Sequence, residues 1–190
     1  MLAGTEYVAR WGYDFSLYRP LLERARALGL PALALNVRAE LTRQIARGGL
    51  ASLTPDELAE LPELDLEDAE HREYIFSLFG VLPEHAADFG LEDVYIAQTA
   101  WDESMADNSA HWLGAAGEGA RVLIFAGVVH CHAAAIPRRF GRRTGFDALA
   151  VAVAYASSLP DPNTPTAVPD GYDLRVVLED GADFRPTTAR

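Results

Sequence analysis

The sequence predicts an α/β fold, in which a small and largely parallel sheet is flanked by helices. Apolar stretches at residues 31–37, 122–126 and 148–156 alternate with longer helical segments, a pattern typical of parallel strands joined by helices. A shorter apolar stretch at 174–178 indicates an edge strand. Because so few strands accompany so many helical residues, we expect some helix faces to lack a sheet partner. The sheet is then either part of a fragment or completed by a second copy of the chain.

The helical segments carry start and stop signals. A helix capped by Ser16 is expected to end at Gly29. The segment 38–47 reads as helical and ends at glycine, and Thr54-Pro55-Asp56-Glu57 is typical of a capping box with proline at the first helical position. Three further helices are expected at about 67–79, 94–113 and 133–140.

Length and composition indicate one domain over residues 1–190, with a proline-rich loop at 157–173 and a loose tail at 180–190. The net charge of −12 argues against nucleic-acid binding, which needs clustered positive charge. The chain has no lysine, so a lysine Schiff base is excluded. No stretch is apolar enough to span a bilayer, and the first residues lack the features of a signal peptide. One short basic cluster contains Arg138, Arg139, Arg142 and Arg143.

The most informative motif follows the apolar stretch 122–126 and reads Gly127-Val128-Val129-His130-Cys131-His132. Ligands of open α/β sheets bind beyond the carboxyl ends of strands, where this motif is expected to lie. In an extended backbone, His130 and His132 point to one side and Cys131 to the other. Two such imidazoles are suited to binding a divalent metal, ligating haem iron or exchanging protons. The position of the motif favours a functional role for His130. For His132, a role as a ligand and a purely structural role are equally good interpretations.

The helix expected at 94–113 carries a second candidate surface. Along one line of this helix, at helical spacing, lie Gln98, Asp102, Met105 and Ser109. This mixed polar and sulfur edge suits the wall of a cleft better than a sealed core. Asp102 is a candidate for orienting an imidazole and fixing its tautomer, and an arginine salt bridge is an equally good interpretation. Trp101 is read as core, whereas His71 and His85 are read as solvated.

Several short motifs lie between Trp11 and Arg143, and their order and spacing are informative. They are Trp11-Gly12-Tyr13-Asp14-Phe15, Tyr18-Arg19-Pro20, Gln98, Trp101-Asp102-Glu103-Ser104-Met105-Ala106, Gly127-Val128-Val129-His130 and Ile136-Pro137. Together these motifs resemble the ChaN-like haem-binding uptake family of the Tiki/TraB/erythromycin-esterase superfamily. Family members begin with a strand ending in Gly-Glu-x-His and a second strand carrying a glutamate. Neither occurs here, so the chain resembles an N-terminally truncated version of the family domain.

The resemblance implies a bacterial haem-binding protein of the iron-uptake type, with haem in a cleft at the strand C-termini. It also implies a homodimer as one way to complete the site, and a small molecule as the ligand. Trp101 and Met105 would pack on the porphyrin, and a tyrosinate or imidazole would ligate the iron. The cofactor-binding residues expected from the resemblance and the motifs are Tyr13, Tyr18, Gln98, Trp101, Asp102, Met105, Gly127, His130 and His132.

Two alternatives remain open at the level of sequence. The first is a metal-assisted or histidine-based hydrolase of the same superfamily, in which His130, Asp102 and Glu103 would be catalytic. In that case His130 and His132 would be the metal ligands. The second is an inactive truncated scaffold whose sheet is closed by a partner. An enzyme is the less favoured reading, and Cys131 is read as a small buried hydrophobe rather than a nucleophile.

Overall fold

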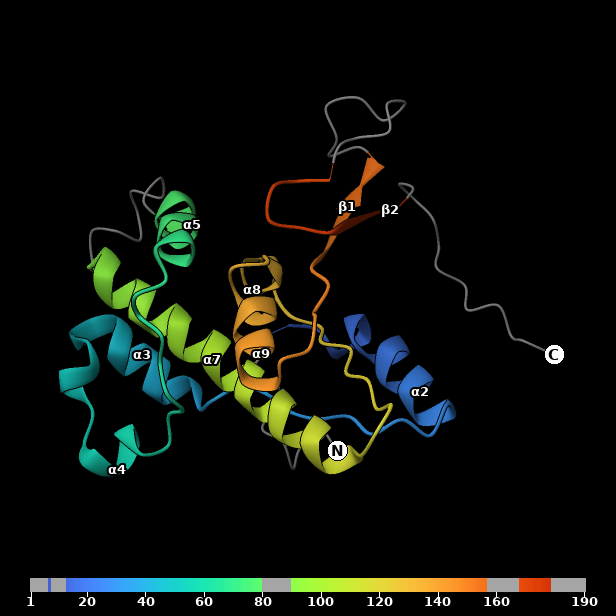
Figure 1. The fold of residues 1–190 in the computed structure, drawn as a ribbon, viewed down its shortest axis with the longest axis horizontal. Helices are drawn as coiled ribbons and strands as arrows, with labels where there is room; N and C mark the ends of the chain where they lie inside the picture. The colour runs from blue at the N-terminus through green and yellow to red at the C-terminus, as the bar shows by residue number, and fades with distance from the viewer. Residues whose placement is uncertain (1–6, 8–12, 80–89, 157–167, 179–190) are drawn as a thin grey trace.

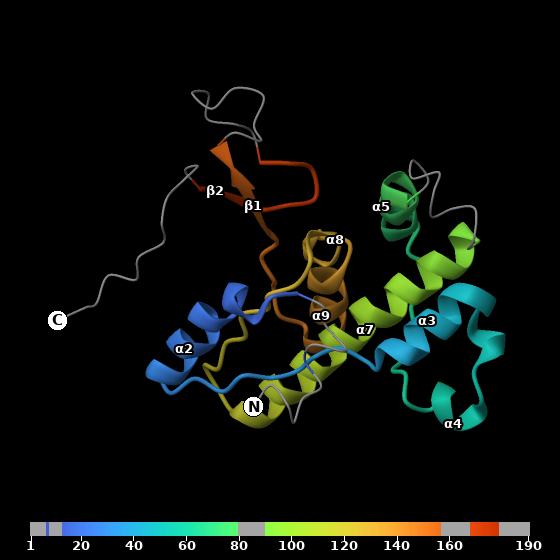
Figure 2. The ribbon, with the colours of Figure 1, turned by 180° about the vertical axis from the view of Figure 1, so that it is seen from behind.

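The long helix α7 (Leu91–Ala116) is the element on which the other helices assemble in the computed structural model. The structure describes residues 7, 13–79, 90–156 and 168–178. Helices α3 (Ala39–Gly48) and α9 (Ile136–Thr144) pack along α7, and α5 (Ala69–Phe79) packs against it as well (Figure 1). The view from behind shows α3 and α9 at different places along α7 (Figure 2).

Shorter elements precede α3 and follow it. They are the 3₁₀ turn η2 (Phe15–Leu17), α2 (Arg19–Ala27), η3 (Leu50–Ser52) and α4 (Pro55–Leu58). The predicted capping box is confirmed, because the Glu57 N–H donates to Thr54 Oγ1 and the Thr54 N–H donates to Glu57 Oε2. Ser16 is not the side chain that caps at the first turn. Asp14 performs that role and accepts the Ser16 N–H at 2.8 Å.

The sheet consists of two parallel strands in the described part of the chain, β1 (Val151–Tyr155) and β2 (Leu174–Leu178). Val151 pairs with Leu174 and Tyr155 with Leu178. The predicted α/β class, with a small parallel sheet and flanking helices, is therefore confirmed. Of the predicted loop at 157–173, only residues 168–173 lie within the described residues, and the predicted tail at 180–190 lies outside them.

The predicted strands at 31–37 and 122–126 are extended, but neither has a strand partner among the described residues. In 122–126 the exposure alternates as in a strand, because Ile124 and Ala126 pack against the helices while Leu123 and Phe125 are 78% and 64% exposed. An isolated extended segment cannot satisfy its backbone groups in a ladder. The prediction of strands at 31–37 and 122–126 was therefore wrong for the described residues.

Two apolar clusters hold the helices together. In the first, Leu41 and Ile45 of α3 meet Ala97 and Ala100 of α7. In the second, α7 meets α9, and the residues buried between them are Met105, Ala106, Ile136 and Phe140. Burying a side chain as large as those of Met105, Ile136 and Phe140 contributes about 1.5–3 kcal/mol to the stability of the fold. The second cluster also receives the inward side chains of the extended segments, and so it fixes where residues 127–132 emerge.

Candidate functional site

Asp102 lies at the centre of a buried polar cluster on α7. Its side chain has no exposed surface, and each carboxylate oxygen faces one imidazole. Oδ1 lies 2.7 Å from Nδ1 of His130, and Oδ2 lies 3.0 Å from Nε2 of His71. The two histidines come from α8 (Val128–Cys131) and α5, so three helices converge on one carboxylate.

His130 reaches Asp102 because the chain turns sharply after the extended segment. Gly127 is the N-cap of the one-turn helix α8, and its carbonyl accepts the His130 N–H at 2.9 Å. The His130 side chain is 14% exposed, and the Trp101 ring meets its edge at a centroid distance of 5.7 Å. The turn thus leaves the His130 side chain slightly exposed and anchors its Nδ1 on α7.

His71 is held from its other side by Arg139. The Arg139 Nη2 lies 2.9 Å from Nδ1 of His71, and both side chains are almost completely buried. Arg139 also donates to the Ala134 carbonyl, and its Nε lies 3.2 Å from Glu103 Oε1. We refer to His71, Asp102, His130 and Arg139 as the Asp102 cluster.

The electrostatics of this cluster favour an ionised carboxylate. Burial by itself raises the pKa of Asp102, but the hydrogen bonds from His130 and His71 and their charges outweigh it, and the pKa is lowered. An ionised carboxylate only accepts hydrogen bonds, so Nδ1 of His130 must be a donor. In the neutral ring, Nε2 of His130 then carries a lone pair and is suited to bind a metal ion or accept a proton.

Glu103 contacts the Asp102 cluster through Arg139 and is neutralised by arginines. Its side chain has no exposed surface and forms ion pairs with Arg139, Arg142 and Arg143 of α9. It also accepts the backbone N–H of Asp65 at 3.1 Å. Glu103 therefore ties α9 to α7 and to the loop before α5.

The outer arginine of the basic block also finds acidic partners. Arg138 pairs with Asp68 at 3.0 Å and with Glu70 at 2.5 Å. The Arg138 and Arg139 charges contribute to lowering the pKa of Asp68, together with the hydrogen bond from the His71 N–H, against the opposing effect of burial. The arginines of the basic cluster seen in the sequence thus form ion pairs within the molecule.

His132 occupies a different environment from His130, because the backbone between them is not extended. The His132 ring stacks on Tyr74 at 3.9 Å and meets Tyr172 edge-on at 5.7 Å. Its Nδ1 accepts the Ala134 N–H at 3.1 Å, and its Nε2 faces Gly171. Burial lowers the pKa of His132 and so favours its neutral form. The expected alignment of both imidazoles on one side was wrong.

Cys131 and the two tyrosines complete this second environment. The Cys131 thiol is half-buried and lies 3.6 Å from the Ala126 carbonyl, and burial raises its pKa. The Tyr172 hydroxyl donates to the Val128 carbonyl at 3.2 Å. Burial and a hydrogen bond with Tyr172 raise the pKa of Tyr74. These groups pack the turn that carries His130 and His132.

The remaining predicted residues fall into two groups. Gln98 and Met105 are buried on α7, with Met105 in the apolar cluster against α9 and the Gln98 Oε1 without a hydrogen-bond partner among the described residues. The tyrosines lie on another segment. Tyr13 is 64% exposed before η2, and the Tyr18 ring is 6.5 Å from that of Tyr7. The structure therefore brings together Trp101, Asp102 and His130, with the tyrosines on a separate element.

Sequence reasoning missed His71 and Arg139. His71 was expected to be solvated because charged residues surround it, but its side chain is buried. The available signal was its spacing to the buried Ile75, since residues four apart share a helix face. Arg139 lies three residues after the buried Ile136, a spacing that also places two residues on one helix face. His85, also expected to be solvated, lies outside the described residues.

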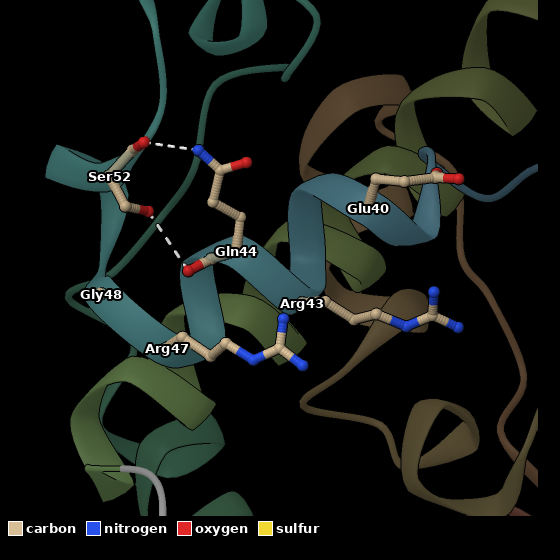
Figure 3. A pocket seen from close by; sticks show the side chains of 6 residues that line it. All are labelled: Glu40, Arg43, Gln44, Arg47, Gly48 and Ser52. Carbon is tan, nitrogen blue, oxygen red and sulfur yellow. Dashed lines mark hydrogen bonds between the residues drawn. The ribbon is translucent and has the colours of Figure 1, made fainter.

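A surface hollow of about 470 Å³ lies on α3, and no residue of the Asp102 cluster lines it (Figure 3). Its lining residues are Glu40, Arg43, Gln44, Arg47, Gly48 and Ser52. Gln44 and Ser52 are tied to each other, because Gln44 Nε2 donates to the Ser52 carbonyl and Ser52 Oγ donates to that of Gln44. None of the residues predicted for the site lines this hollow.

The chain belongs to the family described as haem-binding uptake, Tiki superfamily, ChaN, whose model matches residues 1–140. The matched residues include the whole Asp102 cluster and the turn at 127–132. No curated protein and no solved structure matches the chain. In the part of the chain that the structure describes, no helix has the length and apolarity needed to cross a membrane.

Proposed function

We propose that this chain binds haem for uptake of haem or iron, with Nε2 of His130 as an iron ligand. The hydrogen bond between Asp102 and His130 carries this proposal, because it makes Nδ1 the donor and leaves a lone pair on Nε2 of the neutral ring for a ligand. Histidines that bind metals typically donate their other N–H to a carboxylate or carbonyl. Membership of a family described as haem-binding supports the same reading.

The residues around His130 fit a large apolar ligand. Leu123, Phe125 and Val128 are 78%, 64% and 70% exposed just before His130 in the chain. A porphyrin is a flat apolar surface, and exposed apolar patches commonly mark binding sites. The iron of a bound haem would supply the Lewis-acidic centre for the Nε2 lone pair. A second copy of the chain is proposed as an additional cover for these side chains.

The other candidate residues have proposed supporting roles. Trp101 would limit the rotation of the His130 ring, and Gly127 would help to hold the turn, because its carbonyl accepts the His130 N–H. The buried Oε1 of Gln98, which has no partner among the described residues, is an acceptor for a polar group of the ligand. Met105 would act through packing, and Tyr13, Tyr18 and His132 are the other residues to be tested as ligands.

A haem titration of the purified chain tests the proposal. We expect a shifted Soret band with saturable binding, and loss of that band in His130→Gly. Exogenous imidazole should restore the spectrum in His130→Gly, because it can occupy the place of the missing ring. The matched control is His111→Gly, whose side chain is 79% exposed. No Soret shift in the wild type, or an unchanged spectrum in His130→Gly, would contradict the proposal.

A second candidate function, a histidine-based hydrolase, is favoured by the same hydrogen bond. An imidazole held by a carboxylate is also suited to accept a proton from water. The proposed participation of Glu103 has less support, because three arginines surround its carboxylate. Hydrolysis of a panel of esters and amides, abolished in Asp102→Asn, would favour this reading. An inactive scaffold would show neither hydrolysis nor haem binding.

A further inference from the structure

We infer that His71 and Arg139 are positioning residues that fix which nitrogen of His130 carries its proton. The inference rests on the proposed function only where it predicts a change in haem binding. For the arrangement of protons it rests on hydrogen-bond geometry alone. The two residues lie on α5 and α9, and their side chains are almost completely buried.

The direction of the hydrogen bonds follows from donor and acceptor chemistry. A guanidinium only donates, so at 2.9 Å from Arg139 the Nδ1 atom of His71 must accept. The single proton of the neutral His71 ring therefore lies on Nε2, which donates to Oδ2 of Asp102 at 3.0 Å. Oδ1 is then left to accept from Nδ1 of His130 at 2.7 Å. Arg139 thus sets the direction of the bond from His71 to Asp102. The ionised carboxylate makes Nδ1 of His130 the donor, and His71 holds that carboxylate in the orientation that reaches Nδ1.

The cluster is rigid enough to hold this direction. The His71 and Asp102 side chains are 0% exposed, so water cannot replace either partner. The His71 N–H donates to Oδ1 of Asp68, which fixes the start of α5. Arg139 is held by the ion pair with Glu103 and by the Ala134 carbonyl, so its guanidinium cannot turn away. A carboxylate with two fixed donors has little freedom to rotate.

A purely structural role for His71 makes a different prediction. If His71 only filled space, an apolar side chain of similar volume would leave the proton of His130 on Nδ1. If His71 positions Asp102, removing its N–H frees one carboxylate oxygen, and the carboxylate can turn. His130 would then sample both tautomers, and Nε2 would no longer be a constant acceptor. Second-layer partners of this kind typically change metal affinity 10–100-fold.

The first experiment is a long-range ¹H–¹⁵N NMR spectrum of the wild-type chain without haem. We expect His71 as the Nε2–H tautomer and His130 as the Nδ1–H tautomer. Any other tautomer at either ring would overturn the inference. Because no haem is present, this result stands whether or not the chain binds haem.

The second experiment compares His71→Gln with His71→Leu, and uses the exposed His111→Gln as the matched control. A glutamine at 71 can accept from Arg139 and donate to Asp102, so His130 should keep its Nδ1–H tautomer. The leucine should produce mixed tautomers at His130 and weaken haem binding by about 10-fold or more. A single Nδ1–H tautomer with leucine would overturn the inference. If the leucine variant does not fold, mixed tautomers with glutamine would overturn it instead.

Absence of a Soret shift in the wild type would remove the proposed function alone. A normal Soret shift with the wrong tautomers would remove this inference alone. The two failures are therefore distinguishable in the same set of samples.

Discussion

Asp102 and His130 join the interior of the protein to its surface through one hydrogen bond of 2.7 Å. The carboxylate has no exposed surface, whereas the imidazole side chain is 14% exposed. A carboxylate that solvent does not reach therefore determines which nitrogen of a partly exposed imidazole donates a hydrogen bond.

Asp102→Asn should destabilise the protein by about 3 kcal/mol, because an amide cannot accept hydrogen bonds from both His71 and His130 with both of its polar atoms. The folded pKa of Asp102 is lowered, so its ionisation contributes stability above the unfolded value of about 3.9, which is lost as pH falls through the folded pKa. The difference in stability between wild type and variant should therefore narrow below about pH 4. Urea unfolding at several pH values measures this difference, and a constant difference would contradict the assignment.

Glu103→Gln should cost about 3–5 kcal/mol, because the arginines of α9 lose the buried charge that neutralises them. The exposed Glu118→Gln is the matched control and should change stability by less than about 0.5 kcal/mol. Urea unfolding of the two variants tests the comparison. Similar effects in both would show that the ion pairs around Glu103 add no stability.

Gly171→Ala should be far more damaging than Gly29→Ala. Both glycines have a positive φ, at +77° and +65°, so alanine is strained at either position. A Cβ at 171 would lie 1.7 Å from Nε2 of His132, whereas one at 29 meets nothing within 4 Å. We expect a loss of about 1 kcal/mol at Gly29 and several times more at Gly171. Thermal unfolding of both variants measures the contrast, and equal losses would show that residues 168–173 do not pack on His132 in solution.

His132 should make the protein less stable as pH falls. Burial lowers the folded pKa of His132, so below the unfolded value of about 6.5 the unfolded chain binds the extra proton. The stability contributed by the neutral ring is thus present above about pH 6.5 and is lost as pH falls toward the folded pKa, at up to about 1.4 kcal/mol per pH unit. His132→Phe keeps a ring to stack on Tyr74 and should make the free energy of unfolding depend less on pH. The comparison is made at pH 7 and pH 5, about half a unit above and about 1.5 units below the unfolded pKa. An unchanged slope would mean that other groups cause it.

Cys131 should react slowly with thiol reagents. Its pKa is raised by burial, which lowers the fraction of reactive thiolate at neutral pH. We expect labelling by iodoacetamide to be much slower in buffer than in urea, where the thiol is exposed. Equal rates in the two conditions would show that the turn at 127–132 opens readily.

The sequence predicted the fold class and the helix that carries the site, because both depend on local periodicity. The spacing along 94–113 gave α7, and the motif at 127–132 gave the position of His130. The strands at 31–37 and 122–126 were over-predicted, since apolar alternation shows which side is packed but not whether a neighbouring strand exists. Pairing of that kind is a property of the tertiary structure.

The partner of Asp102 shows the same limit. Sequence reasoning proposed that Asp102 orients an imidazole, and Nδ1 of His130 lies within hydrogen-bonding distance of it. His71 and Arg139 could not be placed there, because they lie on separate helices whose approach depends on how α5 and α9 pack on α7. The expected side-by-side imidazoles required an extended backbone, and the one-turn helix α8 separates them.

The four arginines of α9 have a practical consequence for purification. They form the one short basic cluster of the sequence, yet each pairs with a carboxylate of the same molecule. A heparin or cation-exchange resin should therefore not retain the folded chain at neutral pH, since little positive potential remains to attract sulfate groups. Denaturation would separate these charges from their acidic partners, so retention on such a resin would report unfolded material in a preparation.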